Sequence, residues 1–437
     1  MYSLVCRFCL LFQRANYAWL VLLSFLLAAG CKKRNQDEVF PSIRIDSPTI
    51  GQMFFYLNTI DINASITDDR KLESVIVEVT NAQNVRYLES KTFYPDDKTF
   101  ELNYTITHDD LILPSGTYYI RIRSSDGENE TTVFREIQLI EAPRILERVF
   151  IIRDIGVATA IDTLQGGILS PCITYPQSYL FGGIDSHSQQ LVACGNSATS
   201  LMGFLYPEFE TLNTGFPPTN ENITAFYHDK IHHCYFWGTQ EGNLWRTSIN
   251  GTQLFATIGN APVSRIGIHS NVIIAASEGP TGNYLYVVRN DNGVIETALP
   301  FNWEMEGMIE MTSEPNRVLL IGNENGTAHF VWLNLTTSAF NEVFNFYESS
   351  LVQSVCDGNG NDFFVVHSSG LAQYTNLMSN YTVNGNLIPA KLIFDDLQQS
   401  LWAITPNQLH RLDESGQSVV QTIAAPDIQD LWFKYNK

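Results

Sequence analysis

The segment DIQDLWFKY (Asp427–Tyr435) near the C-terminal end decides the fold, because it completes a repeat that begins far upstream. From about Pro143 the sequence carries six apolar segments that read as strands and end 43, 39, 45, 45 and 38 residues apart. These segments are LVACG (to Gly195), YFWG (to Gly238), IIAAS (to Ser277), LLIG (to Gly322), FFVVH (to His367) and LWAIT (to Thr405). Further short strands, separated by polar turns, flank these segments. The region is therefore a tandem array of similar β units.

The period of about 42 residues is typical of a propeller blade, which is a four-stranded sheet of about 40–45 residues. RVFIIRD (Arg148–Asp154) lies one period before the first of the six segments and is a further strand of the same kind. It is not itself preceded by a short strand of the kind that precedes the other segments. DIQDLWFKY has the form of that missing strand, and pairing the two leaves no exposed sheet edge. We predict a seven-bladed β-propeller over residues 143–437, closed by the C-terminal strand.

Residues 41–142 lack this period and read as strands of a separate β-sandwich. In the strand that begins GTYYIRIR, the side chains of Tyr118, Ile120 and Ile122 alternate with polar ones such as Arg121. Period-two alternation is typical of a strand with one face buried and one face in water. The whole chain is therefore predicted to be all-β.

Residues 1–30 read as a lipoprotein signal peptide. They contain no acidic residue, and Arg7 and Arg14 precede an apolar run from Tyr17 to Ala29. That run is shorter than the roughly 20 residues that a membrane-spanning helix needs. An uncleaved signal anchor and a soluble secreted protein are the alternatives.

The segment LLAAGC (Leu26–Cys31) resembles a lipobox, in which cleavage precedes the cysteine and its thiol receives diacylglycerol. The resemblance implies lipidation at Cys31 and a lipidated leash over residues 31–40. The leash opens with three basic residues, which suit anionic lipid headgroups. We expect a protein anchored to a lipid bilayer of the cell envelope, in the outer membrane, on its periplasmic or outer surface.

The charge balance excludes one class of partner. The chain has 26 basic and 46 acidic residues, and residues 1–34 hold five of the basic ones and none of the acidic. The mature body therefore carries a formal charge of −25. Nucleic acids need a basic face, so we expect no nucleic-acid partner and instead a glycan or a surface protein.

The cysteines beyond residue 31 show no CxxC or other metal-ligand spacing. Either one disulfide forms or the thiols stay isolated and buried, and we favour isolated thiols. These residues are Cys172, Cys194, Cys234 and Cys356.

The spacing Gly116-x-Tyr118 resembles the tyrosine corner of immunoglobulin-like (Ig-like) domains. Residues 41–142 are thus similar to the Ig-like modules that separate the lipid anchor from the functional domain in bacterial surface lipoproteins. The repeats resemble propeller families in architecture only. They lack the Trp-Asp ending, the kelch double glycine and the sialidase Asp-box, so no known signature points to a function.

Candidate catalytic and metal-binding residues are few. No G-x-S-x-G motif occurs, and with 46 acidic residues a carboxylate pair carries no information. His228, Asp229, His232 and His233 share one hairpin, where we expect a solvated turn rather than a metal site, because adjacent strand residues point to opposite faces.

Asp68 and Asp69 at one end of the sandwich form another acidic group. Calcium coordination there is the alternative to an acidic turn, which we favour. We therefore predict no cofactor, and calcium remains an unsupported option.

One tryptophan stands apart. Trp237, Trp245, Trp332, Trp402 and Trp432 fall on predicted strands, where packing is the expected role. Trp303 lies between two blades, so we expect it on the face formed by the loops between blades and the second-to-third-strand turns. Residues expected on this face are Phe216, Glu241, Trp303, Glu304, Asn323, Glu324 and Asn325.

An exposed tryptophan beside amides and carboxylates suits a sugar ring or a peptide. We also keep open that Trp303 folds back onto the propeller. The sequence favours a non-catalytic binding or scaffold protein that holds a glycan or protein on this face. The alternative is a glycan-active hydrolase or lyase with a propeller active site.

Overall fold

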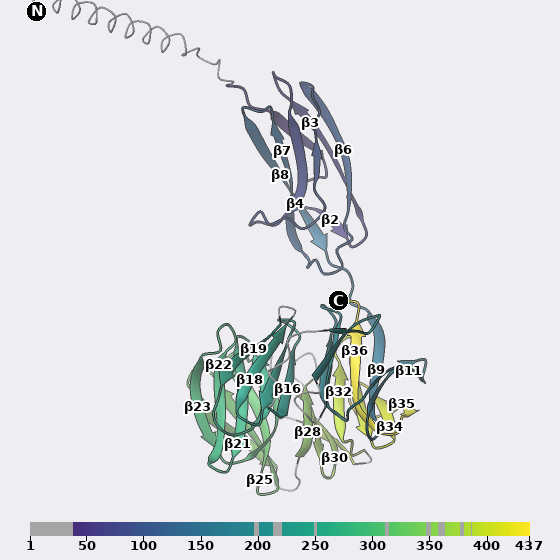
Figure 1. Cartoon of the computed structure of the whole chain (residues 1–437), viewed down its shortest axis with the longest axis vertical. Coiled ribbons are helices and arrows are strands. Elements are labelled where there is room, and N and C mark those ends of the chain that lie inside the picture. Colours follow the sequence, from purple (N-terminus) through teal and green to yellow (C-terminus); the bar gives the residue numbers. More distant parts are fainter. Residues whose placement is uncertain are drawn as a thin grey trace, which may run out of the picture. The chain divides into compact units, whose positions relative to one another are not determined.

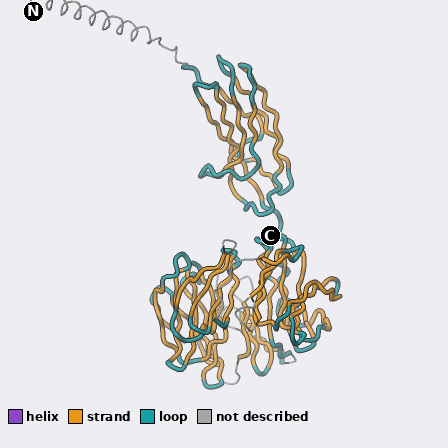
Figure 2. Tube along the Cα trace, in the orientation of Figure 1, coloured by secondary structure: helices purple, strands orange, loops and turns teal. Residues whose placement is uncertain are grey.

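The computed structural model describes residues 38–195, 201–212, 221–248, 251–310, 314–346, 351–356, 363–375, 380–385 and 387–437. In these residues the regular elements are all strands, which confirms the all-β prediction (Figure 2). None of them forms a helix with the length and apolarity needed to cross a membrane. The predicted signal peptide and Cys31 lie outside the described residues.

The chain divides into two compact units, Met1–Ala142 and Pro143–Lys437. Within residues 38–142 the first unit consists of two sheets (Figure 1). The smaller sheet contains, in spatial order, β1 (Ser42–Ser47), β3 (Thr59–Thr67) and β6 (Thr99–Thr107). The larger contains β2 (Gln52–Phe55), β8 (Glu130–Ile140), β7 (Gly116–Ser125), β4 (Ser74–Thr80) and β5 (Lys91–Phe93). Neighbouring strands are antiparallel except β2 and β8, which are parallel.

The first unit has a single core of alternating apolar side chains between its sheets. In β7, Tyr118, Ile120 and Ile122 are buried and Arg121 is partly exposed, which confirms the predicted alternation. The Tyr118 hydroxyl donates a hydrogen bond of 3.0 Å to the carbonyl of Pro114, four residues upstream. Each fully buried side chain of this size contributes roughly 1.5–3 kcal/mol to folding.

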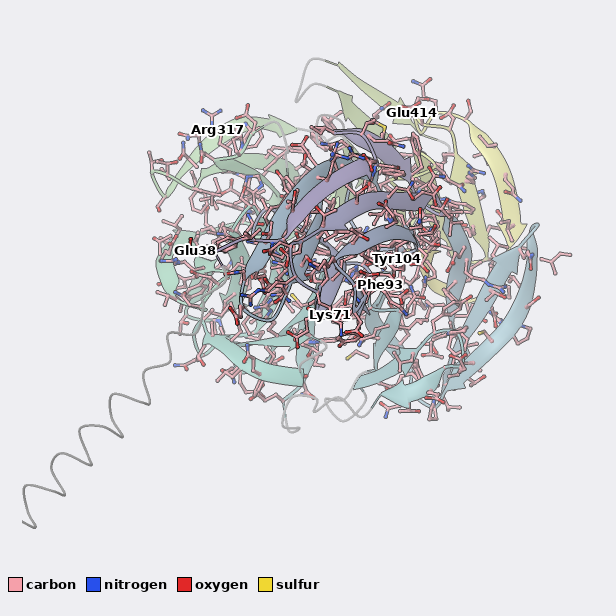
Figure 3. All side chains as sticks on the ribbon, turned by 90° about the horizontal axis from the view of Figure 1, so that it is seen from above. Glu38, Lys71, Phe93, Tyr104, Arg317 and Glu414 are labelled. Carbon is pink, nitrogen blue, oxygen red and sulfur yellow. The ribbon has the colours of Figure 1, made fainter. Side chains whose placement is uncertain are left out.

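Aromatic contacts support the same core at its edge. Phe93 of β5 and Tyr104 of β6 lie on different sheets, and their rings pack edge to face with centroids 5.8 Å apart (Figure 3). This edge-to-face geometry is favourable because the positive ring edge meets the negative ring face.

The second unit contains seven four-stranded antiparallel sheets in its described residues. The first of these sheets contains β12 (Tyr179–Asp185), β13 (Gln190–Gly195), β14 (Leu201–Leu205) and β15 (Glu210–Leu212). The next contains β16 (Ile223–Asp229), β17 (Cys234–Thr239), β18 (Asn243–Ser248) and β19 (Gly251–Thr257). The third contains β20 (Val263–His269), β21 (Val272–Gly279), β22 (Gly282–Arg289) and β23 (Ile295–Phe301). Three more are built from β24 (Glu304–Glu310), β25 (Arg317–Glu324), β26 (Thr327–Asn334) and β27 (Ala339–Phe346); β28 (Leu351–Cys356), β29 (Phe363–His367), β30 (Gly370–Thr375) and β31 (Asn380–Asn384); β32 (Lys391–Asp395), β33 (Ser400–Thr405), β34 (Gln408–Leu412) and β35 (Val419–Ala424).

The remaining sheet, which we call the closing sheet, combines the two ends of the unit. It contains β36 (Ile428–Tyr435), β9 (Leu146–Asp154), β10 (Thr159–Gln165) and β11 (Ile168–Tyr175) in spatial order. β36 runs antiparallel to β9, with Trp432 opposite Phe150 and Tyr435 opposite Leu146. The C-terminal strand therefore pairs with the segment that lacked a preceding strand in the sequence.

The sheets form a ring. The first strand of each sheet contacts the first strands of its two neighbours, in the closed cycle β36, β12, β16, β20, β24, β28, β32 and back to β36. The first strands therefore surround the centre, and the apolar cores lie between adjacent sheets. Radial sheets around a central axis make a β-propeller.

The ring has two ends, defined by the connections found there. The link end carries the links between sheets and the second-to-third-strand turns, and the hairpin end carries the first-to-second-strand turns. In the closing sheet no turn joins the first strand, β36, to the second strand, β9, because the two come from opposite ends of the unit. We call this missing turn, at the hairpin end, the interruption. Instead of a turn, Asn436 donates its backbone N–H to the Ile145 carbonyl at 3.0 Å and accepts from the Ile145 N–H at 2.8 Å.

Candidate functional site

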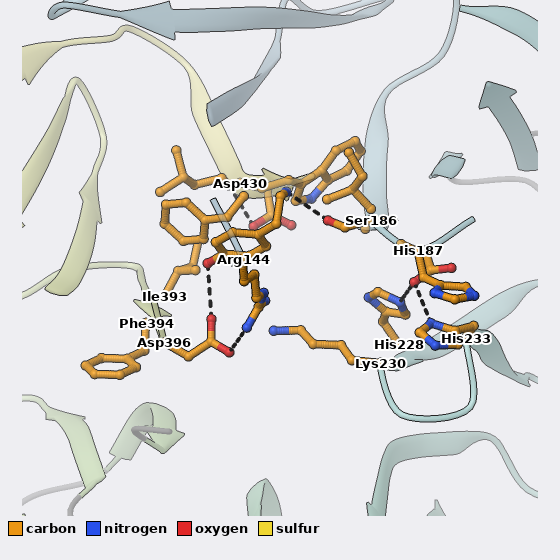
Figure 4. Close-up of a pocket in the computed structure, with 18 of the residues that line it drawn as sticks. Arg144, Ser186, His187, His228, Lys230, His233, Ile393, Phe394, Asp396 and Asp430 are labelled. Atoms are coloured by element: carbon orange, nitrogen blue, oxygen red, sulfur yellow. Dashed lines mark hydrogen bonds and ion pairs between the residues drawn. The ribbon is translucent and has the colours of Figure 1, made fainter. Parts of the chain in front are cut away.

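A cavity of about 470 Å³ lies at the hairpin end of the ring (Figure 4). Its walls come from four neighbouring first strands, β32, β36, β12 and β16, from the turns that follow three of them, and from Arg144, which precedes β9. It therefore includes the interruption in the closing sheet. Cavities of roughly 300–1,000 Å³ are typical sites for small ligands.

A repeated aspartate shapes the turns around this cavity. Asp185, Asp229 and Asp395 are the last residues of β12, β16 and β32. Oδ1 of Asp229 accepts hydrogen bonds of 3.0 Å from the backbone N–H groups of Ile231 and His232. Asp185 and Asp395 accept similar bonds within their own turns. Aspartate favours such turns because its short side chain can bind the backbone two or three residues ahead.

The closing sheet replaces this turn with a charged contact. Arg144 Nη1 lies 2.8 Å from Asp396 Oδ2, and the Tyr435 hydroxyl lies 2.8 Å from Asp395 Oδ1 and 3.1 Å from Asp396 Oδ1 (Figure 4). The Arg144 guanidinium also stacks over the Tyr435 ring, 3.8 Å from its centroid. Arg144 therefore connects the start of the second unit to its last strand.

This contact sets the ionisation of both partners. Burial alone raises the pKa of Asp396, but the hydrogen bond from Arg144 and the charges of Lys230 and Arg144 outweigh it and lower the pKa below its usual value. Burial, followed by the charges of Asp396 and Asp395, raises the pKa of Tyr435 far above its usual value. At neutral pH the carboxylate is therefore charged and the phenol is neutral.

Three histidines gather around Asp185 on the opposite wall (Figure 4). His233 Nδ1 lies 3.1 Å from Asp185 Oδ1, while His228 Nε2 lies 3.7 Å away, beyond hydrogen-bonding distance. The ring of His187 stacks on that of His233 with centroids 3.9 Å apart. The group therefore joins the turns after β12 and β16.

The ionisation of this group follows from burial and from its aspartate. Burial raises the pKa of Asp185, but His228, Ser188 and His233 outweigh burial and hold the pKa far below its ordinary value. Burial lowers the pKa of His228 and of His187. The structure thus places the Asp185 carboxylate beside the neutral imidazoles of His228 and His187 at neutral pH.

An ion pair between a partly exposed lysine and a buried aspartate lines the cavity. Lys391 Nζ lies 2.7 Å from Asp430 Oδ2, which also accepts a hydrogen bond from the Tyr179 hydroxyl. Burial, and then the charge of Asp430, raises the pKa of Tyr179 far above its ordinary value. This carboxylate is therefore neutralised by the protein itself.

Glycine is required where β12 passes the adjacent tryptophan. A Cβ atom at Gly182 would lie 2.5 Å from Trp432 Cζ2 and 2.5 Å from the carbonyl oxygen of Val192, closer than real contacts allow. The absence of a side chain lets the indole pack against the β12 backbone. Trp432 is 5 % exposed and forms part of the cavity wall.

Trp303 lies in a link between sheets, as predicted, but the expectation that it is exposed is wrong. It is 6 % exposed and packs among Phe301, His329 and Phe340, with ring centroids 5.0, 5.2 and 5.3 Å away. The link between β23 and β24 has two residues, and its Trp303 side chain points into the apolar core between the two sheets. The other tryptophans discussed above lie on strands, as predicted.

The other residues predicted for the link end are only partly together. Glu304 is opposite Asn323 in the β24–β25 pairing, and Glu324 and Asn325 follow directly. Glu241 is exposed in the β17–β18 turn, two sheets away around the ring. Phe216 lies outside the described residues.

The turn of the histidine hairpin is exposed at Lys230, Ile231 and His232, as predicted. His233, 38% exposed, also contacts Asp185, and the largely buried His228 faces the same carboxylate, whereas His232 Nδ1 lies 2.7 Å from Asp229 Oδ2. Within the described ranges no group of three or more His, Cys, Asp or Glu side chains is arranged to hold a metal ion.

Two smaller predictions concern acidic and thiol groups. Asp68 and Asp69 occupy the turn after β3, where the Asp69 N–H donates to Asp68 Oδ1 at 2.9 Å. Cys194, Cys234 and Cys172 form no disulfide in the described residues; the first two are buried, but Cys172 is exposed, which differs from the expected burial. The side chain of Cys356 lies outside the described part of the chain.

Sequence reasoning did not find the cavity, because its residues are single positions spread along the second unit. Arg144 and Asp396 are 252 residues apart. One signal was available: an aspartate ends the first strand of three units, at Asp185, Asp229 and Asp395. That repeat marks the hairpin end as a place where polar side chains collect.

No protein-family model matches the chain, and no curated protein matches it. Among solved structures, a protein from Lactobacillus plantarum is similar with a TM-score of 0.52 at 12% identity, over 67% of this chain and 100% of that one. The β-propeller domain of Cps50 (Swd1) from Myceliophteria thermophila has a TM-score of 0.45 at 9% identity, over 57% and 87% of the two chains. A quinoprotein alcohol dehydrogenase-like protein from Bacteroides thetaiotaomicron has a TM-score of 0.42 at 9% identity, over 91% and 99%. At such identity the first similarity concerns the fold alone.

Proposed function

We propose that this chain is a lipid-anchored binding protein of the bacterial cell envelope, and that it holds a glycan in the cavity at the hairpin end. The observation that carries the proposal is the cavity itself, of about 470 Å³, between first strands of four neighbouring sheets. Its size fits one or two sugar units better than the flat surface of a protein. Aromatic Phe394 and Phe433 lie on its walls beside polar groups, the combination that sugar rings need.

The remaining parts of the chain serve the same proposal. The lipobox-like segment ending at Cys31 would attach the protein to a bilayer, with the outer membrane as the proposed location. The sandwich, with the hydrogen bond from Tyr118 to Pro114, would be an Ig-like spacer between the anchor and a seven-bladed propeller. The acidic mature body supports a partner other than nucleic acid.

A glycan-binding screen with a blocked cavity tests this proposal. Gly183 lies on the cavity wall, and a Cβ atom there would be 3.4 Å from Phe226 and 3.8 Å from His228, which are ordinary contacts. A Cβ atom therefore fits at this position, and Gly183→Leu, whose further carbons would extend beside Phe226 and His228, should abolish glycan binding, with its melting temperature measured to show that it folds. Asn325→Ala at the link end is the matched control and should bind as the unmodified protein does.

The opposite result would place the binding site at the link end. If Gly183→Leu keeps its melting temperature and still binds, while Asn325→Ala does not bind, the ligand sits at the link end, as the sequence suggested. Binding by neither the unmodified protein nor the control would count against glycan recognition altogether.

The alternative function, a glycan-active hydrolase or lyase, is favoured by one observation. His233 Nδ1 contacts Asp185, and its ring is 38% exposed at the cavity, so its second nitrogen could accept a proton from a substrate. A hydrolase also needs a carboxylic acid with a raised pKa, but the pKa values of Asp185 and Asp396 are lowered. A lyase therefore fits the site better than a hydrolase does.

Product analysis separates this alternative from simple binding. Acidic and neutral oligosaccharides would be incubated with the protein and examined for unsaturated products and new reducing ends. Unsaturated products that disappear with His233→Ala would establish a lyase. Unchanged oligosaccharides would leave the binding role in place.

A further inference from the structure

Four cationic side chains line the cavity although the protein is acidic. The whole chain has 26 basic and 46 acidic residues, whereas the cavity walls carry Arg144, Lys230, Lys391 and Lys437 against three carboxylates. Among the side chains of Lys, Arg, Asp and Glu, cations are thus in the majority at the cavity, four against three, whereas acids are in the majority in the whole chain. Cationic side chains that line a cavity attract an anion, because the field is focused between low-dielectric walls.

The three carboxylates are already engaged by protein groups. Asp430 Oδ2 lies 2.7 Å from Lys391 Nζ, and Asp396 Oδ2 lies 2.8 Å from Arg144 Nη1. Asp185 Oδ1 lies 3.1 Å from His233 Nδ1. A cation that is available to a ligand must therefore be one that pairs with none of these three carboxylates.

Lys230 is such a group. It is exposed in the turn between β16 and β17, and within the described part of the chain no carboxylate lies at ion-pair distance from it. Its side chain extends across the cavity toward Arg144 and Asp396, which approach from the other wall (Figure 4). Lys230 and Arg144 thus converge on Asp396, whose neighbour Asp395 accepts a hydrogen bond from the Tyr435 hydroxyl.

Two buried polar atoms at the cavity walls also lack partners. His228 Nε2 and Trp432 Nε1 are shielded from solvent and make no hydrogen bond. An unsatisfied buried polar group costs about 1–3 kcal/mol, and such groups in native structures often mark a missing ligand or water. These atoms are independent of the charge count and lie at the same site.

We propose that the cavity recognises its ligand through a negatively charged group, a carboxylate or a phosphate, that binds between Lys230 and Arg144. The inference rests on the proposed function and names the class of ligand: an acidic sugar rather than a neutral one. The apolar wall residues Ile393 and Phe394 strengthen the contact by excluding water from part of the site.

Calorimetric titration of the full chain with matched sugars tests the inference. The probes are galacturonic acid against galactose, and glucose 6-phosphate against glucose, which also separate carboxylate from phosphate. We expect the preferred acid to bind about 10-fold or more tightly than its neutral partner, as for a hydrogen bond to a charged group. Raising the salt concentration should reduce this preference.

Variants assign the preference to the cavity. Lys230→Ala should remove most of the acid preference, and Lys230→Arg should restore it, without a change in melting temperature, because Lys230 is exposed. Arg317→Ala is the matched control. Arg317 is an exposed cation whose nearest carboxylate, on Glu314, is 3.9 Å away, and its loss should leave binding unchanged.

The outcomes separate this inference from the proposed function. Equal affinity for acidic and neutral sugars, or an acid preference that survives Lys230→Ala, would overturn the inference and leave glycan binding intact. Absence of binding by every probe and by the glycan screen would overturn both.

Discussion

The two ends of the ring differ in chain continuity and in charge. At the link end every sheet is joined to the next along the chain, and the polar residues predicted there are carboxylates and amides, including Glu241, Glu304 and Asn323. At the hairpin end one turn is missing, and Arg144 and Lys230 reach the cavity beside it. In the closing sheet no covalent turn joins β36 to β9, and Asn436 and Arg144 make the contacts there.

The link end is tightly packed where a ligand was expected. A Cβ atom at Gly322 would lie 2.3 Å from the Glu304 carbonyl oxygen and 2.3 Å from Trp303 Cδ1. The tryptophan thus fills the space between the link and the sheet behind it. Packing at one end and an interruption at the other are consistent with a charged cavity of about 470 Å³ at the hairpin end.

The largest expected effect comes from removing β36, the C-terminal strand, which no turn joins to β9. Deleting Asp427–Lys437 removes β36, so β9 loses its partner and the ring opens. We expect the second unit to lose cooperative unfolding in calorimetry and to aggregate, while the first unit keeps its own transition.

Deletion of Lys437 alone is the control and should change little, because β36 ends at Tyr435. A long deletion that melts like the full-length protein would show that closure by β36 does not hold the ring together.

The next effect tests whether the link end is core or binding surface. Trp303→Ala should lower the free energy of unfolding by about 3–5 kcal/mol, because it leaves a cavity among buried side chains. Glu304→Ala, at the adjacent exposed position, should stay within about 0.5 kcal/mol. Urea unfolding measures both. Equal stability of the two variants would show that Trp303 is a surface residue and not part of the core.

Sequence reasoning predicted the repeating strands because each carries its own period and apolar alternation. The pairing of β36 with β9 was also predictable, since an incomplete unit at each end requires a partner. The burial of the Trp303 side chain was not predictable from the sequence. Its neighbours Asn302 and Glu304 are polar and exposed, so nothing local indicates that the indole points into the core.

The cavity was unpredictable for a different reason. Its ion pair between Arg144 and Asp396 joins positions that no short motif contains, and it forms only after the ring has closed. A charge count over the whole sequence does not show which charged side chains the fold brings together. An acidic chain can therefore hold a group of cationic side chains at one cavity that its composition does not reveal.

The third effect concerns pH at the hairpin end. Asp185→Asn should lower the free energy of unfolding by about 1–3 kcal/mol at neutral pH, because charged hydrogen bonds with His233 and Ser188 are lost. The pKa of Asp185 is depressed in the folded state, so its stabilisation is complete above the ordinary value of 3.8 and is lost as the pH falls below that value. The difference between variant and parent should therefore shrink below about pH 4.

Urea unfolding at neutral and at acidic pH measures this change. Asp291→Asn is the control, because Asp291 is an exposed partner of Arg289. A difference that persists unchanged to pH 3 would mean that the charge of Asp185 does not stabilise the turn.

The smallest effect compares two arginine ion pairs of similar length, one at the interruption and one in an exposed turn. Arg144 lies 2.8 Å from Asp396 and stacks on Tyr435, whereas Arg289 lies 2.7 Å from Asp291 with about half of each side chain exposed. Exposed pairs contribute about 0–1 kcal/mol and are screened by salt, and a cation–π contact adds about 0.5–1 kcal/mol. Arg144→Ala should therefore cost about 1 kcal/mol and Arg289→Ala less than about 0.5 kcal/mol in urea unfolding at low salt. Part of the Arg144 effect should survive high salt, because stacking depends less on ionic strength than the ion pair does. Equal losses from the two variants at both salt concentrations would show that the interruption is held by Asn436 and the β36–β9 pairing, with no contribution from Arg144.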